Sequence, residues 1–190
     1  MWLDRVKKTY GDNLDITWKN FSLEQINSKE GPEWKAWEQS DVGARRSMMA
    51  ALAAEAARRQ GQELFEKFHL ALLTARHGGE GRLALNEEEP ILEVAAEVGL
   101  DVERMKTDMK DPELAAIIGR DHVEAAETHG AFGTPTFLFE DGTSAYLKTF
   151  IPPEEESAEF FGHFVGMMAH SPYVGEVKRP QPPWPKGSVS

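Results

Sequence analysis

The amino-acid sequence predicts a mixed α/β fold of the α+β kind, in which helices surround a small sheet. Three observations lead to this prediction. Long stretches repeat apolar residues every three to four positions, which is the spacing of a helix with one buried face. Two short stretches rich in strand-forming residues flank the Asp141-Gly142 turn signal. The chain has 190 residues, 41% of them apolar, which is enough for one domain with an insertion or for two small domains.

The first two predicted elements are a helix and a strand. Residues 2–10 carry apolar side chains on one helical face, and the Gly-Asp-Asn sequence at 11–13 ends that helix. Met1 has no side-chain acceptor, so we expect no cap at the helix start. Residues 14–21 alternate apolar and polar side chains, which predicts a half-buried strand, and a loop follows over 22–32.

Residues 42–129 are predicted to form an all-helical block. Two helices lie on either side of Gly61, from the apolar faces Met48, Met49, Leu52, Ala53 and Ala56, and Leu64, Phe65, Phe68, Leu72 and Leu73. Asn86 and Glu89 have the spacing of a capping box before a helix that stops at Gly99. Asp111-Pro112 predicts a cap and first turn for a long helix that reaches about His129.

The last third of the chain predicts a hairpin, a helix and a tail. Residues 136–139 and 143–148 flank the Asp-Gly turn and are expected to pair as antiparallel strands. Residues 154–169 have the apolar pattern of an amphipathic helix. The segment 171–190 is rich in proline, which blocks helices and ladder bonds, so we expect an extended or disordered tail.

Charge and composition exclude several classes of function. The net charge of -11 argues against nucleic acids and anionic membranes as partners, because phosphate binding relies on clustered Lys and Arg. No apolar run approaches the roughly 18 residues that a membrane helix needs, and the first residues lack the apolar stretch of a secretory signal. We therefore expect a cytoplasmic protein. The absence of cysteine excludes disulfides and thiolate chemistry within this polypeptide.

The histidines predict no metal site. The six of them show no His-Glu-x-x-His pair and no close ligand spacing. His122 and His129, both on the long helix, are interpreted as polar surface or interface residues.

One motif resembles a known family. The segment Gly133-Thr134-Pro135-Thr136-Phe137 resembles the proline loop of thioredoxin-like folds, and the order of predicted elements resembles the DsbA family, in which an all-helical domain is inserted into a thioredoxin-like domain. The segment 18–24 is similar to one in the cytoplasmic branch, which includes FrnE-like proteins, 2-hydroxychromene-2-carboxylate isomerases and mycothiol-dependent reductases.

The resemblance implies a division of the chain and a binding site. It implies a thioredoxin-like domain of residues 1–41 and 130–170, a helical insertion at 42–129, and the proline-rich tail. It also implies that Gly133, Thr134 and Pro135 bind a substrate or thiol, with the Thr134-Pro135 bond cis and the Thr134 backbone beside the ligand.

The catalytic half of the family site does not occur in this sequence. Family members place a strand and then Cys-x-x-Cys, or Ser, at the start of the first helix, whereas this sequence begins inside that helix. We therefore assign no catalytic residue and expect the first strand of the sheet to be missing. We expect the sequence to be a shortened form of a longer active protein, and the alternative is a redox-inactive relative.

Two functions of different classes follow. The resemblance implies a thiol-disulfide oxidoreductase or thiol-dependent reductase, acting on a small thiol or disulfide with a low-molecular-weight thiol such as mycothiol or glutathione. The alternative is a redox-inactive module for peptide binding or for self-association as a homodimer. A thiol-dependent isomerase is a third interpretation.

Overall fold

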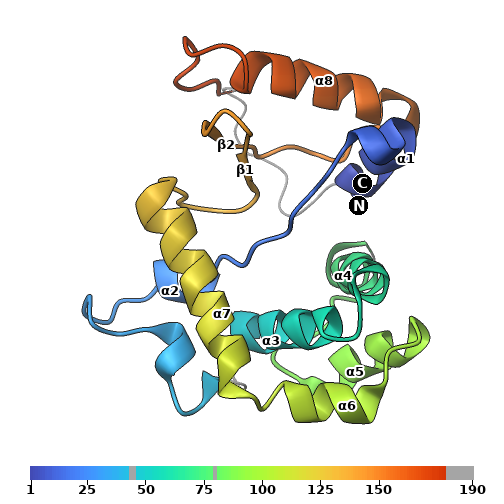
Figure 1. Ribbon diagram of the computed structural model, residues 1–190, viewed down its shortest axis with the longest axis vertical. Coiled ribbons are helices and arrows are strands. Elements are labelled where there is room, and N and C mark those ends of the chain that lie inside the picture. The colour runs from blue at the N-terminus through green and yellow to red at the C-terminus, as the bar shows by residue number, and fades with distance from the viewer. Residues whose placement is uncertain (43–45, 79–80, 179–190) are drawn as a thin grey trace. The chain divides into compact units, whose positions relative to one another are not determined.

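The computed structural model describes residues 1–42, 46–78 and 81–178. It is a mixed structure of many helices with one two-stranded antiparallel sheet (Figure 1). This agrees with the predicted α+β class, a thioredoxin-like fold with a helical insertion. The chain divides into two compact units, one of residues 1–17 with the residues from 129 onward, the other of residues 18–128.

The division of the compact units differs from the one that the family resemblance implies. Residues 18–41, which we grouped with residues 1–17, pack in the helical unit of the structure. Residues 171–178 contain turns and irregular structure, and the rest of the predicted tail lies outside the described residues.

The first unit is built from α1 (Trp2–Tyr10), η1 (Gly11–Asn13), β1 (Thr136–Leu138), β2 (Ser144–Tyr146), η5 (Glu154–Glu156) and α8 (Ser157–Met168). The two predicted helices at 2–10 and 154–169 are confirmed, and the N-cap of α1, Met1, makes no side-chain hydrogen bond, as expected. The hairpin is also confirmed, with Thr136 opposite Tyr146, Phe137 opposite Ala145 and Leu138 opposite Ser144.

Aromatic packing holds the first unit together. α1 and α8 run side by side (Figure 1). The Trp2 ring lies 5.2 Å from the Phe160 ring and 5.9 Å from the Phe161 ring, and its indole N–H donates to the Ser157 carbonyl at 3.1 Å. Phe137 of β1 reaches the same cluster, 4.8 Å from the Phe164 ring. One face of the hairpin is therefore buried against the helices.

The predicted strand at 14–21 is wrong. This segment is irregular in the structure and pairs with no strand among the described residues. Side chains take the hydrogen bonds that a ladder would use. The Asn20 backbone N–H donates to the Asp121 carboxylate at 2.9 Å, and the Trp18 carbonyl accepts from the Arg58 guanidinium at 2.9 Å. A strand needs a neighbouring strand to pair with, and an alternating apolar and polar pattern does not show whether one is present.

The second unit is helical. Its elements are α2 (Leu23–Ile26), η2 (Ala36–Glu38), α3 (Arg46–Arg58), α4 (Gln62–His77), α5 (Glu88–Glu97), α6 (Val102–Asp108), α7 (Pro112–Val123) and the π-helix η4 (Glu124–Thr128). The helices on either side of Gly61 and the long helix opened by Asp111-Pro112 are confirmed. The sequence analysis did not predict α2 or α6 as separate helices.

The helix caps follow the prediction only in part. The Asp111 carboxylate accepts from the Glu113 N–H at 3.0 Å, so this cap is confirmed. The capping box of Asn86 and Glu89 is wrong, because α5 begins at Glu88 with Glu87 as a cap that makes no side-chain bond. With the cap at 87, the capping-box partner would be Pro90, which has no carboxylate.

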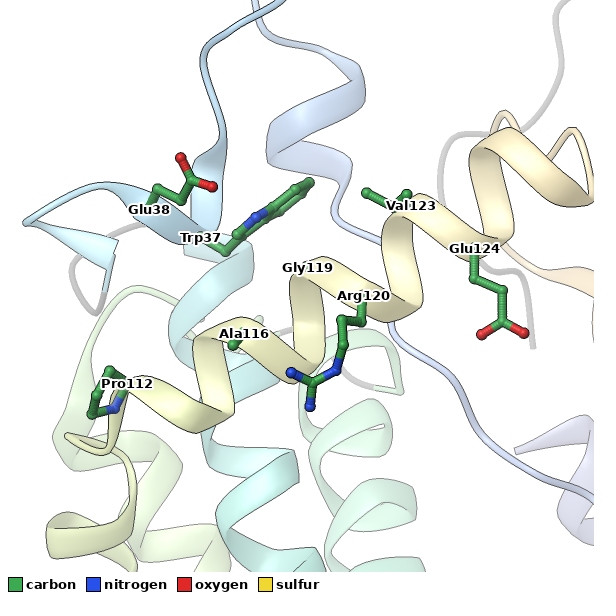
Figure 2. A pocket seen from close by; sticks show the side chains of 8 residues that line it. All are labelled: Trp37, Glu38, Pro112, Ala116, Gly119, Arg120, Val123 and Glu124. Atoms are coloured by element: carbon green, nitrogen blue, oxygen red, sulfur yellow. The ribbon is translucent and has the colours of Figure 1, made fainter.

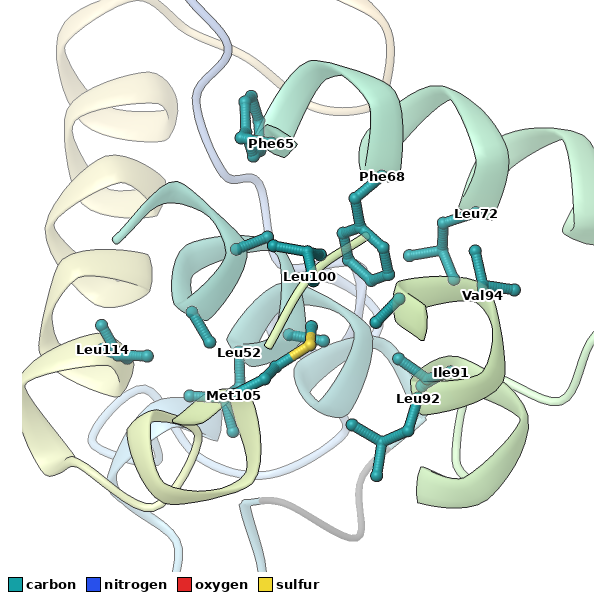
Figure 3. Close-up of a cluster of buried hydrophobic side chains, with 14 of the residues drawn as sticks. Leu52, Phe65, Phe68, Leu72, Ile91, Leu92, Val94, Leu100, Met105 and Leu114 are labelled. Carbon is teal, nitrogen blue, oxygen red and sulfur yellow. The ribbon is translucent and has the colours of Figure 1, made fainter. Parts of the chain in front are cut away.

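The core of the second unit surrounds α3. This helix contacts α2, α4, α5, α6 and α7. Phe65, Phe68 and Met105 are fully buried in this core, and Figure 3 shows Phe68 and Met105 close to Leu100 in the same cluster. None of the helices in the described ranges has the length and apolar character needed to span a bilayer.

Candidate functional site

The predicted binding residues lie together at the start of the hairpin. Gly133, Thr134 and Pro135 directly precede β1, and the Thr134-Pro135 peptide bond is cis. Thr134 and Pro135 are exposed. The Thr136 hydroxyl donates to the Gly133 carbonyl at 2.7 Å, which ties the loop to the strand.

The outer edge of β1 is open among the described residues. The Leu147 N–H donates to the Pro135 carbonyl at 3.2 Å, and the Phe139 N–H donates to the Thr143 carbonyl at 2.9 Å. In an antiparallel pair only every second residue bonds across the ladder, so the main-chain groups of Thr136 and Leu138 point away from β2. Thr134 has no hydrogen bond to another described residue. The loop and edge therefore offer backbone donors and acceptors to a ligand.

Two aromatic rings stand beside this loop. Phe132 is 66% exposed and its ring lies 4.9 Å from the ring of Tyr146, which is 39% exposed. A Cβ at Gly133 would lie 3.2 Å from the Tyr146 ring, so the ring packs closely on the loop backbone. Sequence reasoning missed both residues. The signal that could have found them was an apolar Phe132 inside a glycine-rich turn, and a Tyr146 on the outward register of its strand.

The loop has no cysteine partner in this sequence. The 190 residues contain no cysteine, so no thiolate of this sequence can lie beside Thr134. The loop region as described can bind through backbone groups and apolar contacts, but these groups by themselves break no bond.

A separate polar network lies in the helical unit. The Asp121 carboxylate accepts from the Asn20 side-chain amide at 2.9 Å and from the Lys19 ammonium at 3.2 Å. The hydrogen bond from Lys19 to Asp121 raises the pKa of Lys19. The Asn20 amide also donates to Glu55 at 2.9 Å, and Glu55, only 5% exposed, pairs with Arg58 at 3.2 Å. Every charged group of this network has a partner within it. We therefore interpret the network as a structural one that holds residues 18–20 against the helices.

His122 is buried, so its prediction as a surface or interface residue is wrong. Its ring lies 4.7 Å from the Phe21 ring and 5.3 Å from the Trp37 ring, and it is 5% exposed. Its Nδ1 accepts from the Ser22 N–H at 3.1 Å, which places the ring proton on Nε2. Burial lowers the pKa of His122, so the ring is neutral at pH 7. His129 is half-buried.

A hollow of about 620 Å³ lies between η2 and α7 (Figure 2). Trp37, Ala116, Gly119 and Val123 give it an apolar floor. The charged rim residues Arg120 and Glu124 pair with Glu113 and Lys19. It contains no nucleophile and no set of metal ligands. In the part of the chain that the structure describes, no group of three or more His, Asp or Glu side chains could hold a metal ion.

The comparison with protein-family models identifies the class to which this fold and loop belong. Residues 2–160 match the model of the DSBA-like thioredoxin domain. Because the match covers most of the chain, the protein belongs to the DSBA-like thioredoxin family. It carries the thiol-disulfide oxidoreductase type of fold, with the cysteine pair absent from the 190 residues.

One curated relative extends this result. The chain is 27% identical over 187 residues to the uncharacterized protein Rv2286c of Mycobacterium tuberculosis, across 96% of this chain and 76% of that protein. The aligned region includes residues of both compact units.

Proposed function

We propose that this protein binds a low-molecular-weight thiol, or a disulfide formed from one, at Gly133, Thr134 and Pro135, and takes part in thiol-dependent reduction. The observation that carries the proposal is the exposed residue Thr134, whose backbone has no hydrogen-bond partner among the described residues and which lies just before the open edge of β1. Family membership supports the choice of sulfur compounds as ligands. Glutathione and mycothiol are the two thiols proposed.

The proposed reaction is thiol-disulfide exchange. A thiolate attacks one sulfur of a disulfide, the S–S bond breaks, a mixed disulfide forms, and the second sulfur leaves as a thiolate. A second attack releases the reduced product, so the two electrons come from two molecules of the small thiol. The attacking sulfur is that of the bound thiol or lies in residues outside this sequence. The described residues would hold and orient the reactants.

A redox-inactive binding role is the second candidate. The absence of cysteine from all 190 residues favours it, and the open β1 edge would then take an extended peptide or a second copy of the chain. The isomerase interpretation has no observation of its own in the structure. The similarity of residues 18–24 to the cytoplasmic branch supports the cytoplasm as the proposed compartment.

Titration of the protein with glutathione and with glutathione disulfide, followed by backbone amide NMR, tests the binding. We expect saturable shifts at Gly133, Thr134 and Thr136. The variant Gly133→Ala should weaken binding, because its Cβ meets Tyr146 at 3.2 Å. Gly166→Ala is the matched control, since nothing lies within 4 Å of its added carbon. A titration without shifts at the loop contradicts the proposal.

A rate measurement separates the two candidates. Reduction of a small model disulfide by glutathione is followed with and without the protein. Acceleration that Gly133→Ala diminishes supports the reductase. Saturable binding with an unchanged rate identifies the redox-inactive role.

A further inference from the structure

We infer that Phe132 and Tyr146 form an aromatic subsite that selects sulfur compounds carrying a flat apolar group close to the sulfur. The inference rests on the proposed function, because it assumes that the sulfur compound binds at Thr134. It adds the substrate class: an aryl or benzyl thiol conjugate or disulfide is preferred over a purely hydrophilic one.

The two rings are exposed although they belong to a hairpin whose other face is buried. Phe137 packs on Trp2 and Phe164, whereas Tyr146, opposite Thr136, is on the outward face. Phe132 at 66% exposure and Tyr146 at 39% leave two neighbouring aromatic rings in contact with water beside the loop. Neighbouring exposed apolar groups can form a ligand-binding surface.

The rings are held in a defined geometry. They lie 4.9 Å apart at an interplanar angle of 48°, a tilted arrangement that aromatic pairs favour. The Tyr146 ring also rests on the Gly133 backbone, where a Cβ would meet it at 3.2 Å. A preformed pair loses little side-chain freedom when a third ring packs on it, which favours a flat ligand group over a flexible chain.

The position of the rings sets the length of the preferred ligand. Phe132 and Gly133 are the two residues before Thr134 in the chain, so the exposed ring is two residues from the backbone proposed to meet the sulfur. We expect a group joined to sulfur by one carbon, such as benzyl, to reach the rings from that backbone. The second ring, Tyr146, lies against Gly133, the residue next to Thr134.

S-benzylglutathione and S-methylglutathione test the inference, because they differ only in the phenyl ring and neither reacts with the protein. We expect the benzyl compound to bind roughly tenfold more tightly. We also expect its ring to shift the Phe132 and Tyr146 ring protons. Phe132→Ala should remove the preference, and Tyr146→Phe should keep it because the ring remains. Tyr173→Ala is the control, since Tyr173 is 91% exposed and has no ring partner among the described residues.

The outcomes separate this inference from the proposed function. If both compounds bind at the loop with equal affinity, or if Tyr173→Ala removes the preference as well, the aromatic subsite is overturned and binding at Thr134 stands. If neither compound shifts the amides of Gly133 and Thr134, both proposals fail. If Phe132→Ala instead converts a dimer into a monomer, the rings serve self-association and the subsite is overturned.

Discussion

His122 connects the start of α2 to α7 through one hydrogen bond. The Ser22 N–H donates to Nδ1, while Phe21 and Trp37 pack on the ring. A buried N–H without an acceptor costs more than a hydrogen bond contributes when it forms. For the stability of the protein, a hydrogen-bond acceptor for the Ser22 N–H therefore matters more than the size of the side chain at position 122.

Replacement of His122 by Leu should destabilise the protein by roughly 1–3 kcal/mol, because the buried Ser22 N–H loses its acceptor. His122→Asn also loses the ring contacts, but it can present an oxygen to the same N–H and should cost about 1 kcal/mol less. Urea unfolding of the two variants measures the difference. Equal stability of the Leu and Asn variants would show that the hydrogen bond contributes little.

His69 makes the stability of the folded protein depend on pH. Its ring lies 4.8 Å from Trp18 and 5.5 Å from Phe65. Burial, with a further contribution from Arg58, lowers its pKa to about 4. The unfolded chain takes up this proton near pH 6.5 and the folded one only near pH 4. The contribution of His69 to the free energy of unfolding is therefore fully present above pH 6.5 and is lost as the pH is lowered from 6.5 to 4.

Removal of this histidine should flatten the pH dependence. His69→Gln is expected to lose less stability than the natural protein between pH 7 and pH 4.5, by up to about 3 kcal/mol. His122 remains in the variant and its lowered pKa acts in the same direction, so part of the dependence stays. Urea unfolding at a series of pH values measures both curves. Parallel curves would mean that the pKa of His69 is the same in the folded and the unfolded protein.

At the scale of elements, α7 meets η2 at a glycine. The Trp37 indole lies on the backbone of Gly119, and a Cβ there would be 2.6 Å from the indole nitrogen. The two elements are also in contact along the hollow of Figure 2. Close approach of a large ring to a helix is possible only where the helix has no side chain.

Two glycine-to-alanine variants in helices should therefore have opposite effects. Gly119→Ala should destabilise by roughly 1–3 kcal/mol, because Trp37 must move from a packed position. Gly166→Ala in α8 has open space around the added carbon and should stabilise by up to about 1 kcal/mol, from helix propensity alone. Urea unfolding compares the two, and the fluorescence of Trp37 should change in the first variant only. A stabilising Gly119→Ala would contradict the packing described.

At the scale of the whole molecule, the two compact units have cores of different size. The helical unit buries Phe65, Phe68, Met105 and many smaller side chains around α3. In the hairpin unit, Trp2, Val6 and Phe161 form a smaller cluster with partly buried neighbours, and Phe164 and several alanines are buried as well. Local opening requires less free energy where fewer apolar contacts are lost.

Hydrogen exchange should follow this difference. We expect the amides of α3 and α4 to exchange more slowly than those of α1 and β1, by roughly tenfold or more. Mass spectrometry of peptides from exchanged protein measures the rates for each element. Equal protection across both units would show that the protein opens as one cooperative body.

The elements that the sequence predicted correctly are those with local signals. α4 follows from apolar spacing after Gly61, and α7 from a cap and a proline in its first turn. The hairpin follows from Asp141-Gly142. The strand at 14–21 failed because a strand needs a neighbour that no local pattern specifies. The family motif indicates Gly133, Thr134 and Pro135 as the proposed binding residues, whereas Phe132 and Tyr146 emerge only from their exposure and contact in the folded protein.

By itself, the sequence determined the positions of the longer helices, the hairpin turn, the acidic charge and the absence of cysteine, because each depends on neighbouring residues or on composition. Only the tertiary structure decided that His122 is buried, that Asp121 and Arg58 hold residues 18–20, and that two rings stand beside Thr134. Those features join residues that are distant in the chain. Whether a polar group is paired or a ring is covered depends on what folding brings beside it.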